Sequence, residues 1–168
     1  MRIETTAGLL DASDNAFSAL ESQLQMLALK RTYGAAIAGT NGAGNVAVCE
    51  VKNPSGSGKT LYFIGGSAFV SAASATIVVV DGTSLAPAGT PTPLYAGGGA
   101  SVATVGGGNQ LAPTGTAFIK TGSLSGNSIF LLPVGFWFAL PPNHNLQVQS
   151  SAVAVTNGAN LTWVELST

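Results

Sequence analysis

The sequence predicts an all-β protein: a β-sandwich or jelly-roll-like domain preceded by one N-terminal amphipathic α-helix. Short runs of strand-forming residues follow one another after residue 34, turn signals separate them, and no helix-like segments alternate with them. Short strands with frequent turns are typical of sandwiches and barrels, whereas parallel α/β folds need a crossover helix between strands. We therefore expect an arm and helix over residues 1–34 and a sandwich domain over residues 35–168.

The helix is expected over residues 11–31, which contain no glycine or proline and are rich in Leu, Ala, Gln, Glu and Met. Asp11 or Ser13 can cap its start, and Gly34 is expected to stop it. Its apolar side chains recur every three or four residues and so share one stripe. This stripe is a candidate interface and consists of Phe17, Leu20, Leu24 and Leu27.

Three roles are open for this stripe. It can form a short coiled-coil bundle with other copies of the chain, although Ser13 and Arg31 interrupt the flanking heptad positions. It can equally dock onto a neighbouring protein. In the third case the helix lies on the sheet of its own chain.

Nine strands are expected after the helix, each a short run of strand-forming residues bounded by turn residues or prolines. Their expected bounds are Val46–Lys52, Thr60–Val70, Ala75–Asp81, Ser101–Val105, Ala117–Lys120, Ile129–Leu132, Gly135–Leu140, Leu146–Ser150 and Leu161–Leu166. Dipeptides that favour tight hairpin turns stand at Asn41-Gly42, Asp81-Gly82 and Asn157-Gly158.

The strand chemistry indicates how each strand is covered. Leu146–Gln149 alternates apolar and polar residues, which predicts a sheet with one solvated face. Ile77–Val80 and Ile129–Leu140 are apolar on both faces. Such strands need cover on both sides, by the opposite sheet and by either the helix or a neighbouring subunit.

Three adjacent aromatic residues, Phe136, Trp137 and Phe138, add candidate interface anchors. Consecutive strand residues point to opposite faces, so at least one ring faces away from the core unless another element of the chain covers it. Buried aromatic side chains contribute strongly to contact energies. The stretch 82–115, with two glycine triplets and four prolines, is instead expected to be a long, largely polar excursion at one end of the sandwich.

Charge is the most unusual property of the chain. Charged residues make up 8% of it, against about a quarter in ordinary soluble domains. A free monomer usually stays soluble through charge, so we expect this body either to bury much of its surface in contacts or to present an uncharged polar exterior.

Six scattered cations cannot form a basic face for nucleic acid. No apolar run reaches the roughly twenty residues of a membrane span, and the start lacks a secretory signal.

Catalytic and cofactor motifs are scarce, and we expect no enzyme, cofactor or metal site. The segment Asn53–Thr60 resembles a phosphate-binding loop, but Asn53 stands where that loop needs glycine and a strand follows where a helix is required. His144 is the only histidine and Cys49 the only cysteine. Glu50 and Glu165 are two carboxylates that can in principle pair, yet each is better explained as an outward-facing strand residue, with Lys52 as the partner of Glu50.

Four phrases of the sandwich domain carry a resemblance to a known family. They are a turn phrase at Val51–Lys59 and strand phrases at Leu132–Gly135, Asn145–Val148 and Leu161–Leu166. These phrases, spread over roughly residues 46–166, resemble those of virion structural proteins of tailed bacteriophages, most of all capsid decoration (cement) proteins.

The resemblance implies a sandwich or jelly-roll module that forms a homotrimer and stabilises the phage head through contacts with the major capsid protein. It implies a place on the surface of the virion head after synthesis in the bacterial cytoplasm, and it offers no catalytic residue. The alternative is a tail-fibre or receptor-binding module, which would attach to host surface glycans through the Gly-rich loop and exposed rings.

Overall fold

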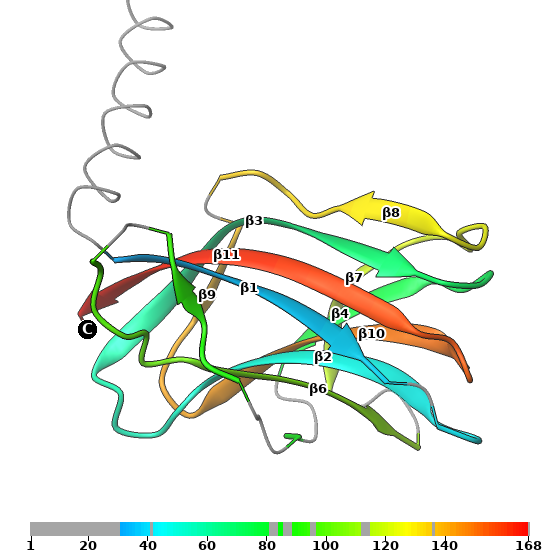
Figure 1. Cartoon of the computed structure of the whole chain (residues 1–168), viewed down its shortest axis with the longest axis horizontal. Coiled ribbons are helices and arrows are strands. Elements are labelled where there is room, and N and C mark those ends of the chain that lie inside the picture. Colours follow the sequence, from blue (N-terminus) through cyan, green and yellow to red (C-terminus); the bar gives the residue numbers. More distant parts are fainter. Residues whose placement is uncertain are drawn as a thin grey trace, which may run out of the picture.

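The structure is a computed structural model that describes residues 31–40, 42–80, 84–85, 89–94, 97–111, 115–135 and 137–167. In this part of the chain, eleven strands form two antiparallel sheets that pack face to face (Figure 1). The prediction of an all-β sandwich is confirmed. The expected helix and its stripe of Phe17, Leu20, Leu24 and Leu27 lie outside the described residues.

The first sheet has the strand order β5-β1-β11-β3-β8, and β9 also pairs with β3. Its strands are β1 (Thr32–Gly39), β3 (Lys59–Val70), β5 (Thr92–Pro93), β8 (Ser128–Leu131), β9 (Phe138–Leu140) and β11 (Asn157–Ser167). The second sheet has the order β6-β2-β10-β4-β7. Its strands are β2 (Val46–Asn53), β4 (Thr76–Val80), β6 (Thr104–Gln110), β7 (Thr116–Lys120) and β10 (His144–Val153).

The core lies between the two sheets and is built by strand alternation, since every second side chain of a strand points to the same face. In β11, Leu161 and Trp163 point inward, and Trp163 packs against Phe63 of β3 with 5.8 Å between ring centroids. In the second sheet, Cys49 and Val51 of β2 face the same space. The largest side chains are fully buried there, so packing alone closes the domain without disulfides.

All nine expected strands are present with shifted ends, and two further strands were not expected. β1 has the sequence Thr-Tyr-Gly-Ala-Ala-Ile-Ala-Gly, in which small residues hide the strand pattern. Gly34, expected to stop a helix, lies inside β1, where it pairs with Thr162 of β11. Small residues are tolerated there because the partner strand β11 fixes the register.

The tight turn expected at Asn157-Gly158 is wrong, because both residues lie in β11. The Asn157 side chain does not serve a turn. Its Nδ2 donates to the carbonyl oxygens of Ala47 and Val148, at 3.1 and 3.0 Å. Asn157 therefore bonds the first sheet to two strands of the second.

The expected excursion over 82–115 is wrong in part, because Thr104–Gln110 forms β6, an edge strand of the second sheet. A glycine triplet suits this strand because β6 approaches β1 closely: a Cβ on Gly107 would clash with the carbonyl oxygen of Ala38. Among its other described residues, Thr92–Pro93 forms β5, which pairs with Tyr33 and Gly34 of β1. The connection from β4 to β6 thus reaches the edges of both sheets.

Candidate interaction surfaces

The outer face of the first sheet is apolar and uncharged at the end where β1 finishes and β8 begins. Strand pairing places Ala38, Gly158, Phe69 and Ile129 side by side in one row across four strands. The next outward-facing row holds Ala36, Asn160, Ser67 and Leu131. We call these two rows the open face, because nothing in the described part of the chain covers them.

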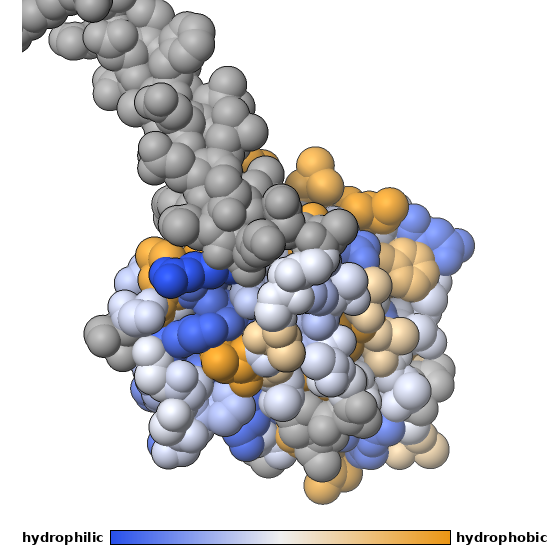
Figure 2. Space-filling view, turned by 60° about the vertical axis from the view of Figure 1, so that its left-hand side comes forward, coloured by the Kyte–Doolittle hydropathy of each residue, from blue (hydrophilic) through white to orange (hydrophobic). Residues whose placement is uncertain are grey.

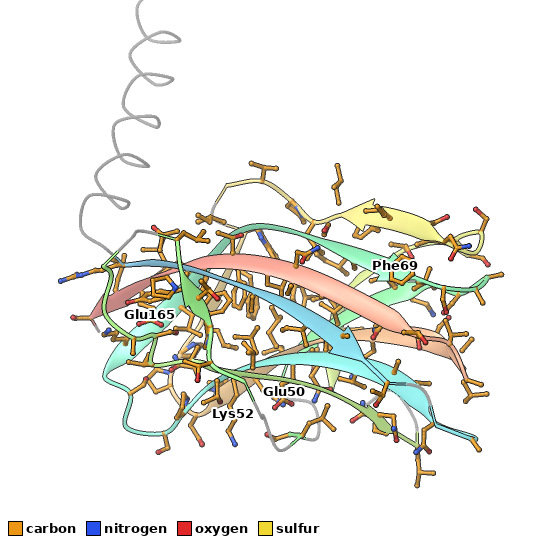
Figure 3. All side chains as sticks on the ribbon, in the orientation of Figure 1. Glu50, Lys52, Phe69 and Glu165 are labelled. Carbon is orange, nitrogen blue, oxygen red and sulfur yellow. The ribbon has the colours of Figure 1, made fainter. Side chains whose placement is uncertain are left out.

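The open face has a hollow beside a ridge. Its hollow, about 340 Å³ in volume, has a floor of small residues that includes Ala36, Ala38 and Gly158. The ridge is formed by β8, where Ile129 is 69% and Leu131 is 73% exposed. Figure 3 labels Phe69, which stands on β3 between the two and lines the hollow. Figure 2 shows orange, hydrophobic residues on the surface of the body among pale and blue ones.

The outer face of the second sheet differs, and we call it the closed face. Its outward residues on the three central strands include Val48 on β2, Gln147 and Gln149 on β10, and Val79 on β4, and all four are buried. The expectation that Leu146–Gln149 leaves one face solvated is therefore wrong. The polar residues of this face are buried and hydrogen-bonded rather than hydrated.

Glu50 is at the centre of the closed face and is fully buried. Its Oε2 accepts from Asn145 Nδ2 at 2.8 Å, Gln147 Nε2 at 2.7 Å and the backbone N–H of Leu85 at 3.0 Å. Its Oε1 accepts from the Ser84 hydroxyl at 3.2 Å. A buried carboxylate is tolerated only when such donors replace water, so this network holds the start of the β4–β6 connection against the second sheet.

Glu165 is likewise fully buried and holds the other end of that connection. Its Oε1 accepts from the backbone N–H of Val102 at 3.0 Å and from the Ser101 hydroxyl. Its Oε2 forms an ion pair with Lys59 Nζ at 3.0 Å. The two glutamates therefore fasten the β4–β6 connection at both ends.

Glu50 lies on the outer face of its sheet, as expected, but the β4–β6 connection covers it, whereas Glu165 lies on the same side of β11 as the inward-facing Trp163, so the outward orientation expected for Glu165 is wrong. Lys52 is not among the partners of Glu50, and Figure 3 shows the two glutamates well apart, Glu50 on β2 and Glu165 on β11. The structure therefore does not bring these two carboxylates together as a pair. The sequence around each glutamate could not reveal this, because the donors come from segments 34 to 106 residues away in the chain.

The aromatic candidates lie at the edge of the core near β9. Trp137 and Phe138 are half-buried, and Phe138 stacks on Phe118 of β7 with 4.7 Å between centroids. Trp137 also contacts Phe63, at 5.8 Å. Phe136 lies outside the described residues. These rings join β7 of the second sheet to β9 of the first, and their role as interface anchors stays a prediction.

The open face was not among the residues expected to form an interface. The sequence feature that points to this face is the run Ile129–Leu140, which is apolar on both faces of the expected strand. The small residues Ala36 and Ala38 gave no signal, because their importance depends on their register beside β11.

Other chemistry-bearing residues lie in structural positions. Burial raises the pKa of the Cys49 thiol to about 12, and its Sγ donates to the Ile37 carbonyl at 3.4 Å. His144 begins β10 and pairs with Asn53 of β2 in the ladder.

The described residues contain no cluster of three or more His, Cys, Asp or Glu side chains suited to a metal ion. They also contain no helix long and apolar enough to cross a membrane.

Comparisons of this chain with protein-family models, with curated proteins and with solved structures found no match.

Proposed function

We propose that this protein is a structural virion protein, a capsid decoration or cement protein that stabilises a phage head through self-association and contacts with the major capsid protein. The observation that carries the proposal is that the two outer faces are covered in the opposite way to that expected of a free monomer. The chain covers its polar face and leaves an uncharged, apolar face open. Exposed apolar patches of this kind mark contact surfaces in proteins that function in assemblies.

The charge distribution supports the same proposal. The only two acidic residues in the described part of the chain, Glu50 and Glu165, are both buried. The already small number of charges therefore contributes even less to the surface than the composition indicates. A surface with so few charged groups suits burial in contacts better than life as a free monomer.

The strand order supports a jelly-roll-like arrangement. β1, β2, β3 and β4 alternate between the sheets, so that β1-β11-β3-β8 faces β2-β10-β4-β7. Jelly-roll domains of two four-stranded sheets occur in viral capsid proteins and in lectins. The fold is an analogy and does not by itself select a function, so the proposal depends on the surfaces.

The proposed mechanism is additive adhesion. Each copy would bridge neighbouring capsid subunits, and linked copies would raise the effective concentration of every further contact. Burial of the open face contributes about 25 cal/mol per Å² of apolar area before ordering costs. No step of this mechanism needs a reactive group.

The test is immunogold electron microscopy of virions from the source of this sequence, using an antibody against the purified chain. We expect label on the heads. Label confined to the tails, together with binding of the purified chain to a glycan array, would instead establish the receptor-binding alternative. Absence of label from intact and disrupted virions would refute both.

A further inference from the structure

We infer that the open face binds the open face of a second copy of this chain about a two-fold axis. The inference rests on the proposed function in one respect, self-association, and names the surface that performs it. The argument uses the two rows of residues across β1, β11, β3 and β8.

The ridge and the hollow are complementary to each other. They lie at opposite ends of the same rows, with the small residues on β1 and the large ones on β8. A two-fold axis within the interface, along the strands and between β11 and β3, places β1 of each copy opposite β8 of the other. Ala38 then faces Ile129 of the second copy, and Ala36 faces Leu131 of the second copy.

The inner strands match under the same operation. Gly158 faces Phe69 of the second copy, so that the one position without a side chain meets the largest ring of the row. Asn160 faces Ser67 of the second copy, and within each copy Asn160 Nδ2 already donates to Ser67 Oγ at 3.3 Å, so two polar pairs meet each other. Small residues thus meet large ones and polar residues meet polar ones, as a self-complementary interface requires.

Charge does not oppose this pairing. Neither row contains an ionisable residue, so the pairing of identical faces brings no like charges together and desolvates no ion. The charged residues of the first sheet, Lys59 and Glu165, lie at the other end of β3 and β11 and already pair with each other.

The area fits a weak contact. Four strands about 4.8 Å apart and about four residues long, the length of β8, at about 3.3 Å each present a face of about 250 Å². Two copies would bury about 500 Å² in total, in the range of weak, transient contacts. A trimer, which the resemblance implies, needs two different contact patches on each copy, inclined to each other so that three copies close into a ring. The ridge and the hollow share one sheet face, which favours two-fold closure.

The test is sedimentation equilibrium of the full chain and of two single variants, Ile129→Asp on the ridge and Ala38→Arg in the hollow. Each variant alone places two charges in the interface, and we expect each to raise the dimer dissociation constant at least tenfold. When the two variants are mixed, the introduced carboxylate of one faces the introduced guanidinium of the other, and the second contact is unchanged. The mixture should therefore form a heterodimer.

Leu111→Asp is the matched control, because Leu111 is 84% exposed and follows β6 of the second sheet. It should leave the dissociation constant unchanged. Circular dichroism of each variant should match the parent chain, and recovery of association in the mixture independently establishes that both variants are folded.

Each outcome decides a separate point. If the chain associates but neither face variant weakens it, the open face is not the interface and self-association through another surface stands. If both variants weaken association and the mixture does not restore it, the two-fold pairing is wrong. A chain that is monomeric at all concentrations refutes this inference together with the self-association in the proposed function.

Discussion

The two outer faces of this sandwich are opposite in chemistry and in cover. The closed face has a carboxylate and several amides at its centre, and all of them are buried. The open face consists mainly of small and apolar residues together with Asn160 and Ser67, and Ile129 and Leu131 project from it into solvent. A monomer gains most free energy by covering its apolar face, so the opposite arrangement is the basis for our proposal that another molecule covers the apolar face. The predictions below test this contrast, in order of expected effect.

The largest effect is expected on the closed face from Glu50→Ala. The substitution removes the acceptor shared by Asn145, Gln147 and the Leu85 amide. Each buried donor that loses an acceptor costs about 1–3 kcal/mol, so we expect a loss of about 3 kcal/mol in the free energy of unfolding, measured by urea denaturation. Lys52→Ala, on the same strand and half-buried, should change stability by less than about 0.5 kcal/mol. Equal effects of the two substitutions would contradict the central role of Glu50.

A smaller effect is expected at the other end of the β4–β6 connection from Glu165→Gln. The amide keeps the shape but loses the ion pair with Lys59, which is partly exposed, and weakens the bond from the Val102 amide. We expect a loss of about 1 kcal/mol, because solvent screens the pair. Hydrogen exchange at Val102 should become faster while the core of β11 stays protected. Unchanged exchange at Val102 would show that Glu165 does not fasten this end.

The pH dependence tests the inner side of β2, where Cys49 neighbours Glu50. The folded-state pKa of the thiol is raised from 9.0 to about 12 by burial. Between these values the unfolded chain releases the proton and the folded chain keeps it, so stability falls as pH rises. Cys49→Ala should reduce the alkaline decrease in unfolding free energy. The native thiol should also resist iodoacetamide at pH 8, and rapid labelling of the folded protein would contradict its burial.

The smallest effect on stability is expected on the open face from Ile129→Ser. Its side chain is exposed in a single chain, so the free energy of unfolding at low protein concentration should change by less than about 0.5 kcal/mol. Val79→Ser on the closed face is the matched comparison, since Val79 is also an outward-facing aliphatic residue but is buried. It should cost about 2 kcal/mol. Similar costs would remove the contrast between the two faces.

The sequence was sufficient for the fold class and for most strands, because turn residues and strand-forming runs are local signals. It failed at β1, where Gly34, Ala36 and Ala38 look like linker residues until β11 pairs with them. It missed the glycine-rich part of β6 after Val105 for a similar reason, since the close approach of β1 favours glycine there. Such contacts join distant segments, and no local pattern encodes them.

The two surfaces were predictable to different degrees. The polar alternation of Leu146–Gln149 predicts a solvated face. Instead, Gln147 donates to Glu50, and Gln149 Nε2 donates to Gln147 Oε1 at 2.7 Å. Alternation identifies which side chains share a face and says nothing of what covers that face. The open face needed the cross-strand register, which places Ala38 in line with Ile129, 91 positions later in the chain.

The fastening of the β4–β6 connection at both ends has a practical consequence for engineering. Between the Leu94 amide, which donates to the Thr32 carbonyl at 2.9 Å, and Ser101, which binds Glu165, the exposed Gly99 offers a point of insertion. A foreign peptide placed there would be held at both ends by contacts that the guest sequence does not alter. Because each doubling of loop length costs only about 0.6 kcal/mol, the sandwich should serve as a scaffold for displaying peptides.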